Sequence, residues 1–266
     1  MKKILTVGLV VSITFVLASG SALAAKFKYE GGAGGKGSIT GAVSYGGKGK
    51  DIEIDLAAGK NSEFCNTHPD AKDMKRVSHK ILANGGKLQN AVIFIDNIAK
   101  GKDWPVETTA FDFKTCDIFP KVAVVRKTTK AMKKAKAVNV TITNQDTEIL
   151  HNPHGYSVAG ANRKTLFNKP LPSKGSIADV TKNLKRFKKK KDRHFFLQCD
   201  QHNFMEADAR IVWNPYYSIT GADGSFKIEG IPAGKYKVVA WHPYAGEVSA
   251  EVTIGDGEAK QNFEIK

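Results

Sequence analysis

The sequence predicts an all-β protein with two folded units. Residues 38–45, 51–56 and 89–96 alternate apolar and polar side chains or run in β-branched residues, and Gly, Asp and Asn separate them. Stretches with a helical period are scarce, and we interpret the best of them, residues 128–136, as a lysine-rich turn. The 266 residues, 41% of them apolar, suffice for about two domains with buried cores.

The N-terminus has the pattern of a secretory signal peptide. Two lysines precede the apolar run 4–18, and small residues at 21–24 end it, so we expect cleavage after Ala24 and removal of residues 1–24. The run is short for a membrane span and no second run follows, so we expect no integral membrane segment after cleavage. The mature protein is then periplasmic or secreted. Residues 25–36 are rich in glycine and are expected to form a flexible linker.

The chain is strongly basic. Its formal net charge is +15, and removal of the two lysines in the signal leaves +13. The densest cationic run, residues 182–193, contains Lys188, Lys189, Lys190 and Lys191. Such runs are usually solvated loops, but these lysines are also candidates to steer an acidic redox partner or to hold the protein near an anionic envelope surface. We expect no nucleic-acid partner, because no recognisable nucleic-acid-binding fold accompanies the charge.

The most informative segment is a C-x2-H-x2-M run formed by Cys199, His202 and Met205, directly after the β-rich residues 194–198. A loop this short brings a thiolate, an imidazole and a thioether round one ion. Two His and one Cys with a weak axial Met form a ligand set for copper. The second histidine is expected from a distant strand, and His151 follows the strand-like residues 137–143. His154 is the alternative.

The pair His151–Asn152 and, about fifty positions on, the C-x2-H-x2-M loop resemble the cupredoxins, the blue copper proteins, with the ligand-loop spacing of amicyanin and pseudoazurin. The resemblance implies a Greek-key β-sandwich in residues 117–212 with one type 1 copper. It also implies that Asn152 ties the two ligand loops together. His154 departs from the usual pattern and leaves the first ligand open. The implied ligands are His151, Cys199, His202 and Met205.

As a cupredoxin, the protein would carry electrons between partners such as an acidic c-type cytochrome, and it would not be an enzyme. The resemblance places the electron entry point at an exposed edge of His202, with Asn203, Phe204 and Pro153 forming an apolar patch. Seven histidines without a His-x-His pair are too few for a multicopper oxidase. The alternatives are a copper-binding or delivery protein, and a non-redox structural or adhesion module of the envelope.

Three cysteines in an exported protein suggest one disulfide and one free thiol. We pair Cys65 with Cys116, because Cys199 alone lies in a ligand-spaced run. The alternative, a disulfide that includes Cys199, would destroy the copper site.

The C-terminal residues 213–266 have a second signature. Strand-like segments between 217 and 243 are separated by an Asp-Gly and a Pro-Ala-Gly turn, which predicts a β-meander. They resemble the carboxypeptidase regulatory-like domain, a transthyretin-like β-sandwich, and residues 37–116 contain segments similar to its first strands. One arrangement inserts the copper domain into this host. The other is a cupredoxin with a long N-terminal extension and an independent tail domain.

Overall fold

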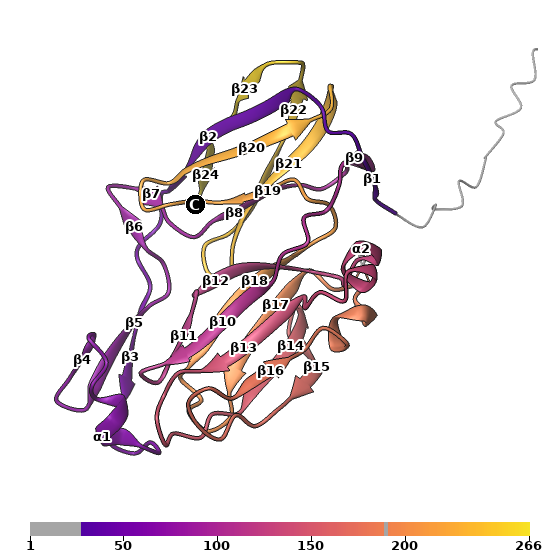
Figure 1. Ribbon diagram of the computed structural model, residues 1–266. Coiled ribbons are helices and arrows are strands. Elements are labelled where there is room, and N and C mark those ends of the chain that lie inside the picture. The colour runs from indigo at the N-terminus through magenta and orange to yellow at the C-terminus, as the bar shows by residue number, and fades with distance from the viewer. Residues whose placement is uncertain (1–27, 189–190) are drawn as a thin grey trace, which may run out of the picture.

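The computed structural model describes residues 28–188 and 191–266, which form two β-sandwiches and a small projecting sheet (Figure 1). The predicted all-β class is therefore confirmed. The predicted signal peptide, residues 1–24, lies outside the described residues. Among the helices of the described part, none has the length and apolar character needed to span a bilayer.

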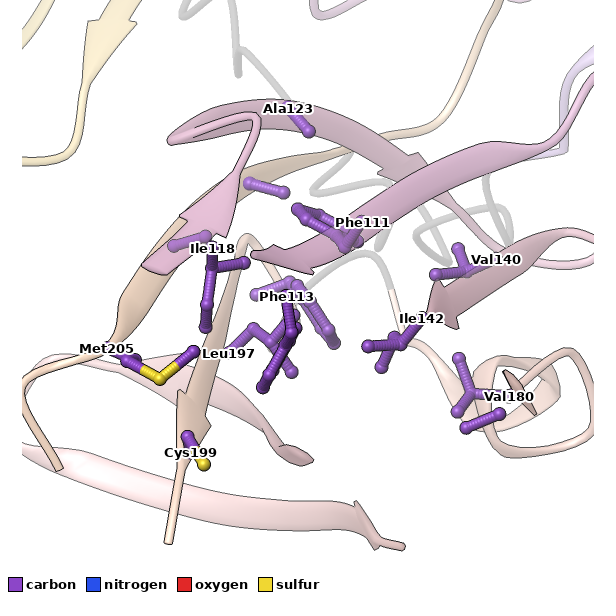
Figure 2. Close-up of a cluster of buried hydrophobic side chains, with 14 of the residues drawn as sticks. Phe111, Phe113, Ile118, Ala123, Val140, Ile142, Val180, Leu197, Cys199 and Met205 are labelled. Carbon is purple, nitrogen blue, oxygen red and sulfur yellow. The ribbon is translucent and has the colours of Figure 1, made fainter. Parts of the chain in front are cut away.

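One sandwich consists of residues 109–212 and encloses the larger core. Alternating apolar side chains such as Phe111, Phe113 and Leu197 meet between its sheets (Figure 2). One sheet has the strand order β11-β10-β13-β16 and the other has the order β12-β18-β17-β14-β15. Their bounds are β10 (Thr109–Lys114), β11 (Asp117–Phe119), β12 (Val122–Arg126), β13 (Val140–Asn144), β14 (Pro153–Ala159), β15 (Asn162–Asn168), β16 (Ile177–Asp179), β17 (His194–Cys199) and β18 (Glu206–Val212).

The other sandwich combines strands from both ends of the chain. One sheet has the order β19-β8-β21-β22, and in the other β2 pairs with β20, β7, β23 and β24, while β7 pairs with β6. Ile39, Ile93 and Val238 lie in its common core. The bounds are β2 (Gly37–Tyr45), β6 (Ala83–Asn84), β7 (Lys87–Leu88), β8 (Val92–Ile95), β19 (Tyr217–Ile219), β20 (Ser225–Ile231), β21 (Gly234–His242), β22 (Gly246–Ile254), β23 (Glu258–Lys260) and β24 (Phe263–Ile265).

The C-terminal strands do not form the predicted β-meander. β19 and β21 both pair with β8, whereas β20 pairs with β2, so the chain alternates between the two sheets from β19 to β21. Only β21 and β22 are consecutive strands that pair as a hairpin among these. The turn residues mark where the chain reverses direction. Apolar strands from the N-terminal half decide which neighbours the C-terminal strands pair with.

The two sandwiches contact each other through an apolar interface. Val92 and Phe94 of β8 and Trp241 of β21 meet Val122 and Val124 of β12. Each of these strands therefore buries both of its faces, one in its own sandwich and one between the sandwiches.

In Figure 1 the sandwich of residues 109–212 is the lower one, and the sandwich that contains β2 and β8 is the upper one. A small sheet projects from the upper sandwich along the side of the lower one (Figure 1). It comprises β3 (Asp51–Asp55), β4 (Ala71–Lys72) and β5 (Lys75–His79), with helix α1 (Ser62–Cys65) between β3 and β4. Cys65 of α1 forms a disulfide with Cys116, which lies in the turn between β10 and β11. The predicted pairing of these two cysteines is confirmed.

Part of the predicted flexible linker is a strand. β1 (Glu30–Gly32) pairs in parallel with β9 (Lys100–Lys102), and the N–H of Glu30 donates to the carbonyl of Ala99 at 2.8 Å. The ring of Tyr29 packs edge-on against Trp104 and Tyr216. Backbone pairing and one aromatic anchor hold a segment whose glycine content suggested flexibility.

The predicted turn at residues 128–136 contains the short helix α2 (Lys130–Lys134). Thr129 caps it by accepting the N–H of Met132 at 3.2 Å, and the Met132 side chain is fully buried. One cap and one buried side chain thus stabilise a helical turn within a lysine-rich segment. A 3-10 turn, η1 (Asn183–Arg186), lies in the other lysine-rich segment.

Candidate metal centre

Three donor side chains converge at one end of the lower sandwich. His151 lies between β13 and β14, Cys199 ends β17, and His202 follows in the next turn. The Cys199 Sγ lies 3.7 Å from His151 Nδ1 and 3.8 Å from His202 Nδ1. All three residues are buried. The structure thus brings together a thiol and two imidazoles that the sequence places 48 and 3 residues apart.

The segment from Cys199 to Met205 is a closed loop between the antiparallel strands β17 and β18. The N–H of Cys199 donates to the carbonyl of Met205 at 3.1 Å, and the N–H of Met205 donates to the carbonyl of His202 at 2.9 Å. Met205 is fully buried in the same apolar cluster as Cys199 (Figure 2). The fourth residue of the predicted set therefore faces the core at the same end of the sandwich.

The remote nitrogen of His151 is held by Asp146, a residue that the sequence analysis missed. His151 Nε2 lies 2.9 Å from Asp146 Oδ2, and both side chains are buried. The same carboxylate accepts the N–H of Thr115 at 2.6 Å and of Cys116 at 3.0 Å. Burial raises the pKa of Asp146, but these hydrogen bonds outweigh it and keep the pKa below its usual value. A carboxylate on Nε2 leaves Nδ1 free to face Cys199.

The remote nitrogen of His202 is held by Asn61. His202 Nε2 lies 3.1 Å from Asn61 Oδ1, an acceptor, so Nε2–H donates and Nδ1 faces Cys199. Asn61 directly precedes α1 and adopts a left-handed conformation with φ of 53°. The contact joins residues 141 positions apart, and no local pattern in the sequence indicates it.

The Cys199 thiol has an unusually low pKa. Burial raises it, but hydrogen bonds with His151 and His202 and from the N–H of Asn152 at 3.3 Å outweigh burial and lower the pKa to about 6. Burial lowers the pKa of His151, and the hydrogen bonds with Asp146 and Cys199 more than compensate, so it lies above its usual value. Cys199 is therefore poised as a thiolate, the form that binds metals.

Asn152 and His154 take different positions at the site. Besides its N–H on the Cys199 sulfur, Asn152 accepts the N–H of Asp200 at 3.0 Å and so joins the two loops. His154 lies outside the donor cluster: its Nδ1 is 3.1 Å from Asp200 Oδ2 and its Nε2 is 3.0 Å from Thr165 Oγ1. His151 is the histidine that faces Cys199.

The expected exposed edge of His202 is absent. His202 is 2% exposed, Pro153 is buried and Phe204 is half-buried. The expectation rested on a sandwich whose ligand loop faces solvent, whereas Asn61 and the segment around it cover the loop.

The donor set fits a first-row metal. Bonds of about 2.0 Å to nitrogen and about 2.3 Å to sulfur that meet at a trigonal angle separate the two donors by about 3.7 Å. The observed separations of 3.7 and 3.8 Å match this geometry. Thiolate sulfur with two imidazoles is the chemistry that favours copper among such metals.

Of the predicted docking lysines, Lys188 and Lys191 are exposed, while Lys189 and Lys190 lie outside the described residues. The loop that carries them precedes β17, and Cys199 ends this strand. At about 3.3 Å per residue the two ends of β17 are about 17 Å apart. Lys188 and Lys191 therefore lie near the end of the strand that is remote from the donor cluster.

Neither the protein-family models nor the curated proteins contain a match to this chain. Among solved structures, the copper-containing nitrite reductase (NirK) from Thermus scotoductus SA-01 is similar over 44% of this chain, with a TM-score of 0.27 and 13% identity. The match spans 25% of the reductase chain. A likeness this distant assigns neither family nor activity, and the site geometry alone supports the function proposed below.

Proposed function

We propose that this protein is an exported electron carrier that binds one type 1 copper through His151, Cys199 and His202, with Met205 as a weak axial ligand. The observation that carries the proposal is the buried convergence of two Nδ1 atoms on one thiolate sulfur at 3.7 and 3.8 Å. When bound, copper supplies a reversible one-electron couple between Cu(I) and Cu(II).

Hydrogen bonds from the chain's own residues restrict movement of the donor side chains when the charge of the site changes. Asp146 and Asn61 fix both imidazoles through their remote nitrogens, and the N–H of Asn152 fixes the thiolate. The ring of Phe113 packs edge-on against His151 with centroids 5.4 Å apart. Side chains held this way cannot reorient freely when the charge of the site changes, and this favours fast electron transfer over chemistry on a substrate. We therefore propose no enzymatic activity.

The basic net charge of the chain suggests the kind of partner, and the disulfide suggests the compartment. A strongly basic protein suits an acidic redox partner such as a c-type cytochrome, or association with an anionic envelope surface. The Cys65–Cys116 disulfide agrees with an oxidising compartment outside the cytoplasm, periplasmic or secreted.

A copper-delivery role predicts an accessible and loosely held site. The donors here are buried and hydrogen-bonded at their remote atoms, which favours retention of the metal. A structural or adhesion role would not require a buried thiol poised as a thiolate between two imidazoles.

Spectroscopy of the copper-loaded mature protein tests the proposal. We expect an intense visible thiolate-to-copper band and a narrow hyperfine splitting in the electron paramagnetic resonance spectrum, with one copper per chain. Cys199→Ser removes the thiolate and should abolish the band. A wild-type protein that binds Cu(II) without a thiolate band would refute the carrier and leave the delivery role.

A further inference from the structure

The segment 57–66, here named the strap, covers the donor loop. Asn61 Oδ1 contacts His202 Nε2 at 3.1 Å, and Lys60 Nζ donates to Gln201 Oε1 at 2.8 Å. Phe64 packs against the core of the lower sandwich. The strap belongs to the small projecting sheet and not to residues 109–212, so a segment from outside the lower sandwich covers its donor loop.

Asn61 occupies a helix-capping position without capping. It directly precedes α1, where an Asn side chain ordinarily accepts a backbone N–H of the first turn. Its side chain makes no such bond, and its backbone adopts the left-handed conformation with φ of 53°. The amide instead contacts His202. Helix α1 therefore lacks a side-chain cap, and the imidazole of His202 has a hydrogen-bond partner.

The disulfide connects the partners of both histidines. The Sγ atoms of Cys65 and Cys116 and one ring nitrogen of His202 all lie within 4.8 Å of one another. Asn61 is four residues before Cys65, and the N–H of Cys116 donates to Asp146, which holds His151. A helix of four residues is not stable alone, so the disulfide, the packing of Phe64 and the Lys60–Gln201 hydrogen bond together hold α1 and Asn61 in place.

We propose that the strap and the Cys65–Cys116 disulfide form a positioning device for the metal centre, with Asn61 as the positioning residue for His202. The device fixes the Nδ1 atom of His202 toward Cys199 and keeps water and external ligands away from this imidazole. Its role in metal retention rests on the proposed copper function. Its role in orienting His202 does not, because the contacts exist among the chain's own atoms.

Nuclear magnetic resonance of the metal-free protein with 15N-labelled histidine tests the orienting role. At mildly alkaline pH the wild type should show a slowly exchanging Nε2–H on His202. In Asn61→Ala this proton should exchange at least tenfold faster, and Asn61→Asp, which keeps an acceptor oxygen, should restore protection. Glu63→Ala, at an exposed position of the same helix, is the matched control. An unprotected Nε2–H in the wild type, or wild-type exchange in Asn61→Ala, overturns the proposal.

Copper loss to a competing chelator tests retention separately. We expect about 10- to 100-fold faster loss from Asn61→Ala and from Cys65→Ala/Cys116→Ala than from wild type and Glu63→Ala. Should the double variant fail to fold, Asn61→Ala still decides, because its disulfide is intact. Loss at the wild-type rate overturns the retention role. Failure of the wild type to form a copper–thiolate band refutes the proposed function, and the metal-free exchange result still stands on its own.

Discussion

Asp146 shows how one buried carboxylate fixes the position of a histidine side chain, that of His151. Its two oxygens accept three N–H groups, from His151, Thr115 and Cys116. Two of these donors are backbone groups of the turn that carries the disulfide. The side chain therefore fixes the histidine relative to the covalent frame of the sandwich.

Asp146→Asn should weaken copper binding by about 10- to 100-fold, because the amide offers one acceptor oxygen to three donors and removes the negative charge from His151. It should also destabilise the fold by about 1–3 kcal/mol through an unsatisfied buried N–H. Competition titrations with a chelator measure the affinity. Asp112→Asn, in β10, is the control. Equal copper affinities in the two variants would contradict the role given to Asp146.

At the residue scale the sequence predicted the donors but not their partners. Cys199, His202 and Met205 are recognisable because a short loop places them together whatever the rest of the fold does. Asn61 meets His202 across 141 positions, and only the long-range packing of the strap creates this contact. Asp146 lies five residues before His151, a spacing that carries no general meaning in a loop.

The hairpin between β21 and β22 contains a buried titratable group. His242 is 2% exposed, and its Nδ1 accepts the N–H of Tyr244 at 3.3 Å and of Ala245 at 3.2 Å. Burial lowers the pKa of His242 to about 4. The turn thus depends on a neutral imidazole.

This turn should make stability depend on pH. The unfolded histidine has a pKa of about 6.5, so between pH 6.5 and pH 4 the unfolded chain binds more protons than the folded one, and stability falls as pH falls. Between pH 7 and pH 4.5 the loss from His242 should be about 2 kcal/mol. His242→Asn keeps an acceptor for the turn but does not titrate. Urea unfolding at the two pH values should show a smaller loss in the variant, and equal losses would contradict the assignment.

At the scale of elements, the alternation of apolar and polar residues predicted where strands lie but not which strands pair. The segment 38–45 lies within β2 and the segment 89–96 contains β8, because alternating or β-branched apolar residues between turn residues mark a strand. The meander failed because β19, β20 and β21 pair with β8 and β2, which lie more than 100 residues away in sequence. The helix α2 was missed because one buried Met132 in a run of lysines gives no periodic signal.

At the scale of the molecule, one sandwich is built from strands at both ends of the chain, and the segment between them in sequence forms the other sandwich. β2 pairs with β20 and β7 along one edge and with β23 and β24 along the other. Ile39 and Val43 of β2 are fully buried. The sequence indicated two units, but neither the apolar interface between them nor the strap over the donor loop has a local signature.

Proteolytic cleavage of the backbone in the exposed loop 46–50 should leave the two fragments bound to each other. A protease site engineered between Gly47 and Gly49 separates β2 from the remainder of the chain, yet the buried β2 side chains and its strand pairing should hold the fragment in place. Size-exclusion chromatography should give one peak under native conditions and two fragments in urea. Release of the N-terminal fragment without denaturant would contradict a shared core.

The most direct test of the account is the position of copper in crystals of the loaded protein, located by anomalous scattering at the copper edge. The account predicts one peak, bonded to His151 Nδ1, Cys199 Sγ and His202 Nδ1, with the Met205 sulfur at a longer distance. A peak bonded to His154 and Asp200 instead, or no peak at Cys199, would contradict it.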